Sequence, residues 1–264
     1  MLDCPADDDE DAKAEMKNLP YRARVGMLLW LARNTRPDIA YQVNALARVA
    51  HNPGLPHWHA STHLLKYVSG TRDMGLIYKR SDALAGVPGQ IKPVLWSDAT
   101  WAPDYGDAYD NYRSTSGWMA TVGDNVLSWS SHRQSVVAQS STESEWYAAG
   151  DAAKEAAHLR KLLVDLGNKV HGPITLHCDN QSTIKQSVNS VDQHSSRHVG
   201  QRYHYLRQQC NSGKLSLSFV PTTEQRADIF TKVLPKAPHK YLRSLLRVQN
   251  MHDDIVTAPI LVPV

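Results

Sequence analysis

The chain has little of what marks secreted, disulfide-stabilised or membrane-spanning proteins. Its 264 residues include only 3 cysteines, Cys4, Cys178 and Cys210, at scattered positions that form no metal-type pair. Such sparse cysteine favours a reducing compartment over a disulfide framework. No stretch is long and apolar enough to span a membrane, and no apolar signal segment opens the chain. We therefore expect a soluble, intracellular protein with no membrane partner.

A strong overall charge is also missing. The formal net charge is only +3, so charge alone gives no argument for nucleic-acid binding. Hydrophobic residues make up 42% and charged residues 21%, a balance that indicates a globular chain able to build a sizeable core. The acidic run "DDDEDAKAEMK" is the exception. It predicts a disordered acidic tail over residues 1–18.

The first part of the chain is expected to be mainly helical. Between Tyr21 and Val68, apolar residues recur at helical spacing and prolines interrupt the pattern. The sequence therefore predicts a small helical unit over residues 19–80, closed by a strand in "MGLIYKR". Small and turn-forming residues then predict a linker over residues 81–91.

After Lys92 the pattern becomes that of a mixed α/β domain, expected over residues 92–235. The segments "PVLWSDA", "SGWMATVG" and "NVLSWSS" predict three antiparallel strands. A helix from Ser141 to about Leu166, a strand "ITLHCD", two further helices, a strand "KLSLSFV" and a short helix from Gln225 follow. This order predicts a mixed sheet with helices packed on it. In the tail, residues 236–264, "KYLRSLLRV" predicts one amphipathic helix.

Two glutamates, Glu143 and Glu145, open the long alanine-rich segment "SSTESEWYAAG". On a helix, steps of roughly 4, 7, 11, 14 and 18 residues return to the same face. From Glu145 these steps meet apolar residues throughout, namely Ala149, Ala152, Ala156, Leu159 and Leu163. Glu143 is expected to point outward, as an acid favoured by the helix macrodipole. For Glu145, partial exposure and a functional role remain equally open, because a buried carboxylate needs compensation.

Three aspartates lie where a strand is expected to end or a helix to begin. Asp98 ends the first strand, Asp179 ends "ITLHCD", and Asp228 opens the helix after "LSLSFVP". Each one alone could be a cap or a turn residue, and Asp179 with Asn180 would make a good helix N-cap. Together with Glu145 they indicate a hard-cation site, because carboxylate oxygens suit Mg²⁺ or Mn²⁺.

An ordered series of motifs resembles the ribonuclease H region of copia-type LTR-retrotransposon polyproteins. The motifs are "SDATWA", "RSTSGWMATVGDNVLSWSS", "SSTESEWYAAGDAAKEAAHLRKLL", "CDNQSTI", "RYHYLR" and "FVPTTEQRADIFTKVL". Upstream, "YRARVGMLLWLARNTRPDIAYQVNALARVAHNPGL" is similar to the segment that joins reverse transcriptase to ribonuclease H in those polyproteins. The resemblance covers residues 19–234. It implies a ribonuclease H-like, mixed five-stranded sheet with flanking helices, preceded by a small, mainly helical connection segment.

The resemblance also implies a chemistry and its residues. The family binds two Mg²⁺ ions through four acids, which fall on Asp98, Glu145, Asp179 and Asp228, with Mn²⁺ as an alternative ion. These ions hydrolyse the RNA strand of an RNA–DNA hybrid, the expected partner. Residues expected to contact the nucleic acid are Ser114, Thr115, Ser141, Thr142, Asn180, Gln181, Arg197 and His198. The family acts in the cytoplasm, inside virus-like particles, or in the nucleus, alongside other parts of its polyprotein.

Some family features are missing. The loop "FVPTTEQRAD" lacks the histidine that many cellular ribonucleases H carry there, Thr100 replaces the usual acid of "SDADWA", and Trp146 replaces a tyrosine. No Tyr-x-Asp-Asp motif of a reverse transcriptase occurs in the chain. We therefore expect a fragment or degenerate product with the connection segment and ribonuclease H but without polymerase.

Several rival interpretations are weaker. A zinc site at His194 and His198 with Cys210 lacks a paired cysteine motif, so surface or nucleic-acid-facing histidines are favoured. The serines of "SSTESE" lack the Gly-x-Ser-x-Gly elbow of a serine hydrolase. Base stacking by tryptophans on neighbouring strands is less favoured than core or inter-layer packing; these tryptophans are Trp96, Trp118 and Trp129. Two alternatives stay open: a remnant that binds hybrid or structured RNA without cutting it, and a helical unit that exposes "MLLWLA" without the polymerase.

Overall fold

The computed structural model describes residues 14–79, 91–101, 112–188 and 200–252. Three sequence predictions lie wholly or largely outside these ranges: residues 1–13 of the acidic tail, the linker, and the group His194, Arg197 and His198. Met16, at the end of the acidic run, is buried in the core. None of the helices in the described ranges combines the length and the apolarity needed to cross a membrane.

The N-terminal unit is helical, as its pattern predicts. It contains α2 (Tyr21–Asn34), the short 3₁₀ helix η1 (Pro37–Ile39), α3 (Ala40–Arg48), α4 (Leu55–Gly70) and the strand β1 (Met74–Leu76). Proline lies in the first turn of both η1 and α4, where its missing N–H costs no helical hydrogen bond. The buried residues of α2 recur every three or four positions and face the core; they are Tyr21, Val25, Leu28 and Ala32.

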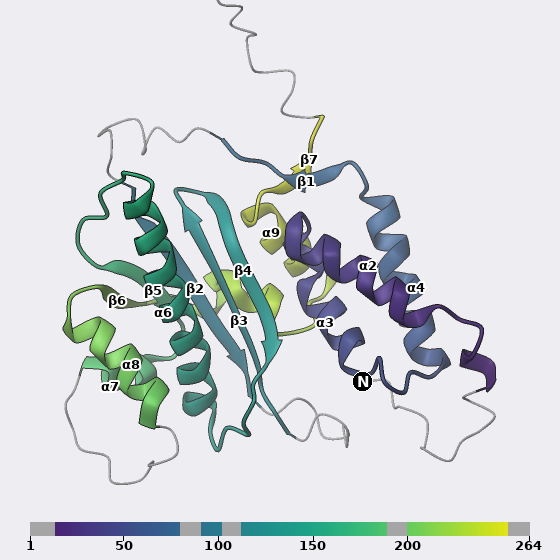
Figure 1. The fold of residues 1–264 in the computed structure, drawn as a ribbon, viewed down its shortest axis with the longest axis horizontal. Coiled ribbons are helices and arrows are strands. Elements are labelled where there is room, and N and C mark those ends of the chain that lie inside the picture. Colours follow the sequence, from purple (N-terminus) through teal and green to yellow (C-terminus); the bar gives the residue numbers. More distant parts are fainter. Residues whose placement is uncertain (1–13, 80–90, 102–111, 189–199, 253–264) are drawn as a thin grey trace, which may run out of the picture.

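A five-stranded mixed sheet forms the centre of the molecule (Figure 1). Its strands are β2 (Pro93–Thr100), β3 (Thr115–Val122), β4 (Asn125–Arg133), β5 (Ile174–Cys178) and β6 (Leu215–Phe219). The strand order is β4-β3-β2-β5-β6, antiparallel from β4 to β2 and parallel from β2 to β6. Gly123, at a φ of 59°, makes the tight turn between β3 and β4.

Helices cover one face of the sheet. The long helix α6 (Ser141–Asp165) packs on β2 and β3, with α7 (Gln181–Val188) and α8 (Gly200–Asn211) beside it. The alanine-rich stripe of α6 lies against Leu95, Ala120 and Leu176 of the sheet. Small side chains let the helix approach the strands closely. The expected ribonuclease H-like sheet with flanking helices is confirmed.

The opposite face of the sheet packs against the N-terminal helical unit and the segment that follows β6. After the 3₁₀ helix η2 (Thr222–Glu224) come η3 (Arg226–Phe230), α9 (Lys236–Leu245) and the strand β7 (Val248–Asn250). β7 pairs antiparallel with β1, so the last described segment adds a strand to the N-terminal unit. α9 is the amphipathic helix predicted in "KYLRSLLRV", and it buries Leu242. The predicted short helix from Gln225 is confirmed as η3, in 3₁₀ form.

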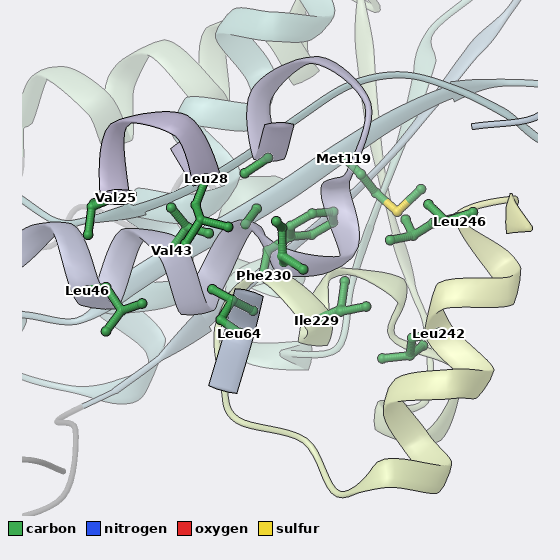
Figure 2. Packing of buried hydrophobic residues seen from close by; sticks show 14 of the residues in the cluster. Val25, Leu28, Val43, Leu46, Leu64, Met119, Ile229, Phe230, Leu242 and Leu246 are labelled. Carbon is green, nitrogen blue, oxygen red and sulfur yellow. The ribbon is translucent and has the colours of Figure 1, made fainter. Parts of the chain in front are cut away.

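A single hydrophobic cluster joins this face to the N-terminal unit. It brings Leu28 and Val43 of the helical unit together with Met119 of the sheet and with Phe230 and Leu246 near the end of the chain (Figure 2). The segment "MLLWLA" is partly buried and partly exposed to solvent. Leu28 is buried, whereas Met27 and Trp30 are 65% and 63% exposed. The sheet therefore covers much of the helical unit's apolar surface.

Candidate active site

The four acids singled out in the sequence meet at one edge of the sheet. Asp98 lies on β2 and Asp179 directly follows β5, its parallel neighbour, so both reach the same edge. Glu145 comes from the second turn of α6, and Asp228 comes from η3. The helix and the 3₁₀ turn approach this edge from opposite faces of the sheet. Four separate elements thus contribute one carboxyl group each.

Glu145 and Glu143 have the different roles that the helical pattern indicates. Glu145 is only 6% exposed, and its Oε1 accepts a hydrogen bond of 3.0 Å from the backbone N–H of Ala99. Glu143 caps its own helix: its Oε2 accepts from the N–H of Gln139 at 2.7 Å, while its N–H donates to the N-cap Ser140. Glu143 therefore stabilises the start of α6, and Glu145 faces the acidic site.

Asp98 and Asp228 share an ion-pair partner, Lys232. The ammonium group of Lys232 lies 2.9 Å from Oδ1 of Asp228 and 3.8 Å from Oδ2 of Asp98. The hydroxyl of Thr231 also donates a hydrogen bond to Asp98, which is 3% exposed. Lys232 follows Asp228 by four residues, close to one helical turn, and this spacing could have identified it in the sequence.

Asp179 lies at the more open side of the site. Its Oδ2 accepts a hydrogen bond of 3.0 Å from the hydroxyl of Thr222. Ligand atoms of Asp179, Glu145 and Cys178 all lie within 4.8 Å of one another. Burial raises the pKa of the Cys178 thiol well above its usual range, which disfavours the thiolate form when no metal is bound.

The carboxyls of the site repel one another. Burial, followed by the charges of Asp98 and Asp179, raises the pKa of Glu145 well above its ordinary value. Burial and the charge of Asp98 raise the pKa of Asp228 to about 7, although Lys232 opposes the rise. Burial also raises the pKa of Asp98. Because several acids lie close together with limited access to water, ionising all of them at once is unfavourable.

This donor set fits hard divalent cations. Carboxylate oxygens are the ligands that Mg²⁺ prefers, and neighbouring acids with raised pKa values are stabilised when cations neutralise them. Among the described residues, the group of His, Cys, Asp and Glu side chains close enough to hold a metal contains no histidine, and Cys210 lies outside it. The geometry therefore favours oxygen ligation over the tetrahedral nitrogen and sulfur ligation of zinc.

Residues expected to contact nucleic acid surround this edge. Thr115 lies directly opposite Thr100 in the β2–β3 ladder, two residues beyond Asp98. Ser114 and Thr115 are buried, whereas Ser141 is exposed at the start of α6 and Thr142 is half-buried. Asn180 caps α7, because its Oδ1 accepts from the N–H of Thr183 at 3.0 Å.

Gln181 is exposed at the first turn of α7, next to Asp179. Arg197 and His198 lie outside the described residues.

Of the tryptophans, Trp96 is buried in the core. Trp129 packs against the same core and donates its Nε1–H to the carbonyl of Ala32. The interpretation of these two tryptophans as packing residues is confirmed.

Gly117 is a site residue that the sequence did not reveal. It pairs with Asp98 in the β2–β3 ladder, and η3 crosses directly over it. A Cβ atom added at Gly117 would lie 2.6 Å from both the Cβ of Phe230 and the Cγ2 of Thr231. Glycine is therefore required here for the close approach that brings Asp228 to Asp98. No local sequence signal marks a contact of this kind, which joins segments far apart in the chain.

Comparison with known proteins relates the chain to polyproteins of transposons. No family model matches the chain. The chain is 34% identical over 254 residues to the retrovirus-related Pol polyprotein from transposon TNT 1-94 of Nicotiana tabacum, which covers 95% of this chain and 18% of the polyprotein. It is 36% identical over 216 residues to that from transposon RE2 of Arabidopsis thaliana, covering 82% of this chain and 14% of the relative.

Among solved structures, RNase H1 from Halobacterium salinarum NRC-1 covers 54% of this chain and 95% of its own, at 20% identity and a TM-score of 0.38. The chain spans less than a fifth of the length of the two polyproteins. Sequence identity over most of its own length nevertheless shows that the chain belongs to the copia-type, retrovirus-related Pol polyproteins of transposons.

Proposed function

We propose that the chain is a ribonuclease H-type endonuclease that hydrolyses the RNA strand of RNA–DNA hybrids during retrotransposon reverse transcription. The observation that carries the proposal is the convergence of four carboxyls from β2, α6, β5 and η3 on one sheet edge. Structural networks of acids are normally paired with bases. Here the structure records ion pairs between this cluster and the side chain of Lys232.

Asp98, Glu145, Asp179 and Asp228 would hold two Mg²⁺ ions, or Mn²⁺ ions. Bound there, the ions would supply an activated water and stabilise the leaving oxygen of the phosphodiester. The chain's own groups preorganise this site. The N–H of Ala99 fixes one oxygen of Glu145, and Thr231 fixes one oxygen of Asp98. Fixed oxygens lose little entropy when they bind a cation, which favours tight and specific binding.

The hybrid is proposed to lie across the same edge. Ser141, Thr142, Asn180 and Gln181 lie on elements that border the acids, and we assign them, with Arg197 and His198, to contacts with the sugar-phosphate backbone. Ser114 and Thr115 are expected from the sequence to contact the nucleic acid as well, but both are buried, so we leave them out of this assignment. Contacts to 2′-hydroxyls and groove shape would distinguish a hybrid from DNA, with little dependence on base sequence. We further propose that residues 92–235 form the catalytic domain and residues 19–80 the connection segment of a polyprotein acting in the cytoplasm or nucleus.

A direct test is cleavage of a labelled RNA–DNA hybrid by the purified chain with Mg²⁺, beside Asp98→Asn and a matched RNA duplex. The proposal expects the wild-type chain to cut the hybrid only, and Asp98→Asn to lose at least about a hundredfold in rate. Folded wild-type protein that binds the hybrid but leaves it intact would refute the enzyme and identify a binding remnant instead.

A further inference from the structure

Asp228 lies on η3, a short turn whose position depends on the segments that pack against it. η3 is a 3₁₀ turn of five residues, Arg226–Phe230, and helices of this type are short and poorly hydrogen-bonded. The side chains on either side of Asp228 do not face water: Ala227, Ile229 and Phe230 are each 0% exposed. The location of Asp228 is therefore set by the surfaces against which these three apolar residues pack.

One of these surfaces is the sheet. Gly117 of β3 allows η3 to lie directly on the strands, and Gln225 ties the start of η3 to β2. The Nε2 of Gln225 donates to the carbonyl of Ser97 at 2.9 Å, and its Oε1 accepts from the N–H of Ala227 at 3.2 Å. These contacts fix one side of the turn.

The other surface is the N-terminal helical unit. α3 packs on η3, and Val43 is fully buried in the same hydrophobic cluster as Ile229 and Phe230. Figure 2 shows Val43 and Leu64 of this unit on one side of Phe230, with Leu246 on another. Closely packed side chains hold their neighbours in place, because a core at native packing density is not easily deformed.

The helical unit is itself held firmly to the sheet. Trp129 of β4 donates to the carbonyl of Ala32 at 2.8 Å, and Arg48 at the end of α3 donates to Oγ1 of Thr115 at 2.8 Å. The chain's far end adds further ties, since Arg243 of α9 donates to the hydroxyl of Tyr67 at 3.1 Å. η3 is thus enclosed between two bodies that are fixed to each other.

We propose that the N-terminal helical unit, through Val43 on α3, is a positioning element for Asp228 and so sets the affinity of the active site for Mg²⁺. This inference rests on the proposed function of the four acids. Asp228 and Asp98 repel each other when both are ionised, and the hydrogen bonds of a short 3₁₀ turn are weaker than those of an α-helix. Packing of Ile229 and Phe230 against α3 opposes the separation of the two carboxyls. Loosening the packing allows the turn to retreat and weakens cation binding without removing a ligand.

The test compares Val43→Ala with Val25→Ala in the full chain. Both valines belong to one cluster and are 0% and 3% exposed, and the same atoms are removed. Val43 lies on α3, which packs on η3, whereas Val25 lies on α2, which packs mainly on α3. The readouts are the Mg²⁺ concentration that gives half-maximal hybrid cleavage and the rise in Tm on adding Mg²⁺, at a temperature where circular dichroism shows both variants folded.

Val43→Ala is expected to raise the Mg²⁺ requirement at least about threefold and to shrink the Mg²⁺-induced rise in Tm, while Val25→Ala leaves both unchanged. In an Asp228→Asn background, Val43→Ala should change the Mg²⁺ response no further. Equal responses in the two valine variants, or none in either, would overturn the proposal. If Val43→Ala does not fold, Val43→Thr keeps the side-chain shape and is judged by the same criteria.

The two hypotheses fail in different ways. A wild-type chain that cuts no hybrid refutes the proposed enzyme, but the Mg²⁺-induced rise in Tm still tests the positioning of Asp228. A wild-type chain that cuts the hybrid, with an unchanged Mg²⁺ requirement in Val43→Ala, preserves the enzyme and refutes the positioning role.

Discussion

Replacing one carboxyl of the acidic site should make the metal-free protein more stable. Asp228 is half-buried at the edge of the sheet beside Asp98, with Lys232 as its ion-pair partner. Burial and the Asp98 charge nevertheless raise its pKa from 3.8 to about 7, which means that the fold disfavours the ionised form. Asp228→Asn keeps the size of the side chain and one acceptor oxygen, while it removes the charge and replaces the second oxygen with an NH₂ donor. Function, and not stability, would then explain why aspartate stands here.

The magnitude follows from the pKa. Each tenfold change in proton affinity corresponds to about 1.4 kcal/mol, so the rise at Asp228 amounts to about 4 kcal/mol, and we halve it to about 2 kcal/mol because water reaches part of the carboxyl. A carboxyl whose pKa is raised on folding binds protons more tightly in the native state. Stability is therefore lost as the pH rises from about 4 to about 7. Asp228→Asn should gain its full advantage above about pH 7 and none below about pH 4.

Thermal unfolding followed by circular dichroism in EDTA measures this effect. At about pH 8, Asp228→Asn should raise Tm by roughly 4–8 °C, and adding Mg²⁺ should then narrow the gap by stabilising the wild type more than the variant. The control is Asp73→Asn, at a carboxyl that is 57% exposed, which should change little. An Asp228→Asn variant that unfolds at a lower temperature than the wild type in EDTA at about pH 8 would refute the reasoning.

Three further outcomes are expected. Gly117→Ala forces a Cβ against η3, so it should cost about 1–3 kcal/mol in urea unfolding and reduce hybrid cleavage at least about tenfold. Lys232→Met removes the counter-charge of two acids, so Tm in EDTA should fall and the Mg²⁺-induced rise should grow. The Cys178 thiol is buried with a raised pKa, so mass spectrometry should find its alkylation at least about tenfold slower in native than in unfolded protein.

Each of these has a matched comparison. Gly26 on α2 has open space where a Cβ would be added, so Gly26→Ala should not reduce cleavage, and equal effects of the two substitutions would remove the case for Gly117. A Lys232→Met variant more stable than the wild type in EDTA would show that the lysine does not neutralise the acids. Equal alkylation rates in native and unfolded protein would show that Cys178 is accessible.

The acids of the site could be found in the sequence because each follows a local rule. Asp98 lies two residues before the end of β2 and Asp179 directly follows β5, where side chains of parallel neighbours converge. Glu145 was separated from Glu143 by helical periodicity alone, and the structure confirms the division through their different hydrogen bonds. The three antiparallel strands and the amphipathic helix near the end of the described chain follow from equally local patterns.

The features that the sequence did not reveal are contacts between distant segments. Gly117 meets Phe230 across more than a hundred residues, and no pattern around either one marks the encounter. The pairing of β1 with β7 joins the N-terminal unit to a segment that the sequence set apart as a tail. Lys232 was overlooked although its spacing from Asp228 was readable, because a lysine near a helix usually interacts with solvent.

The central claim is that this acidic edge cuts RNA, and the two glutamates of α6 test it most directly. Glu145→Gln and Glu143→Gln change the same side chain two residues apart on one helix, one facing the site and the other capping the helix. In Mg²⁺-dependent cleavage of an RNA–DNA hybrid, Glu145→Gln should lose at least about a hundredfold in rate, and Glu143→Gln should stay within about threefold of the wild type. Equal rates for the two variants, or a larger loss in Glu143→Gln, would contradict the account.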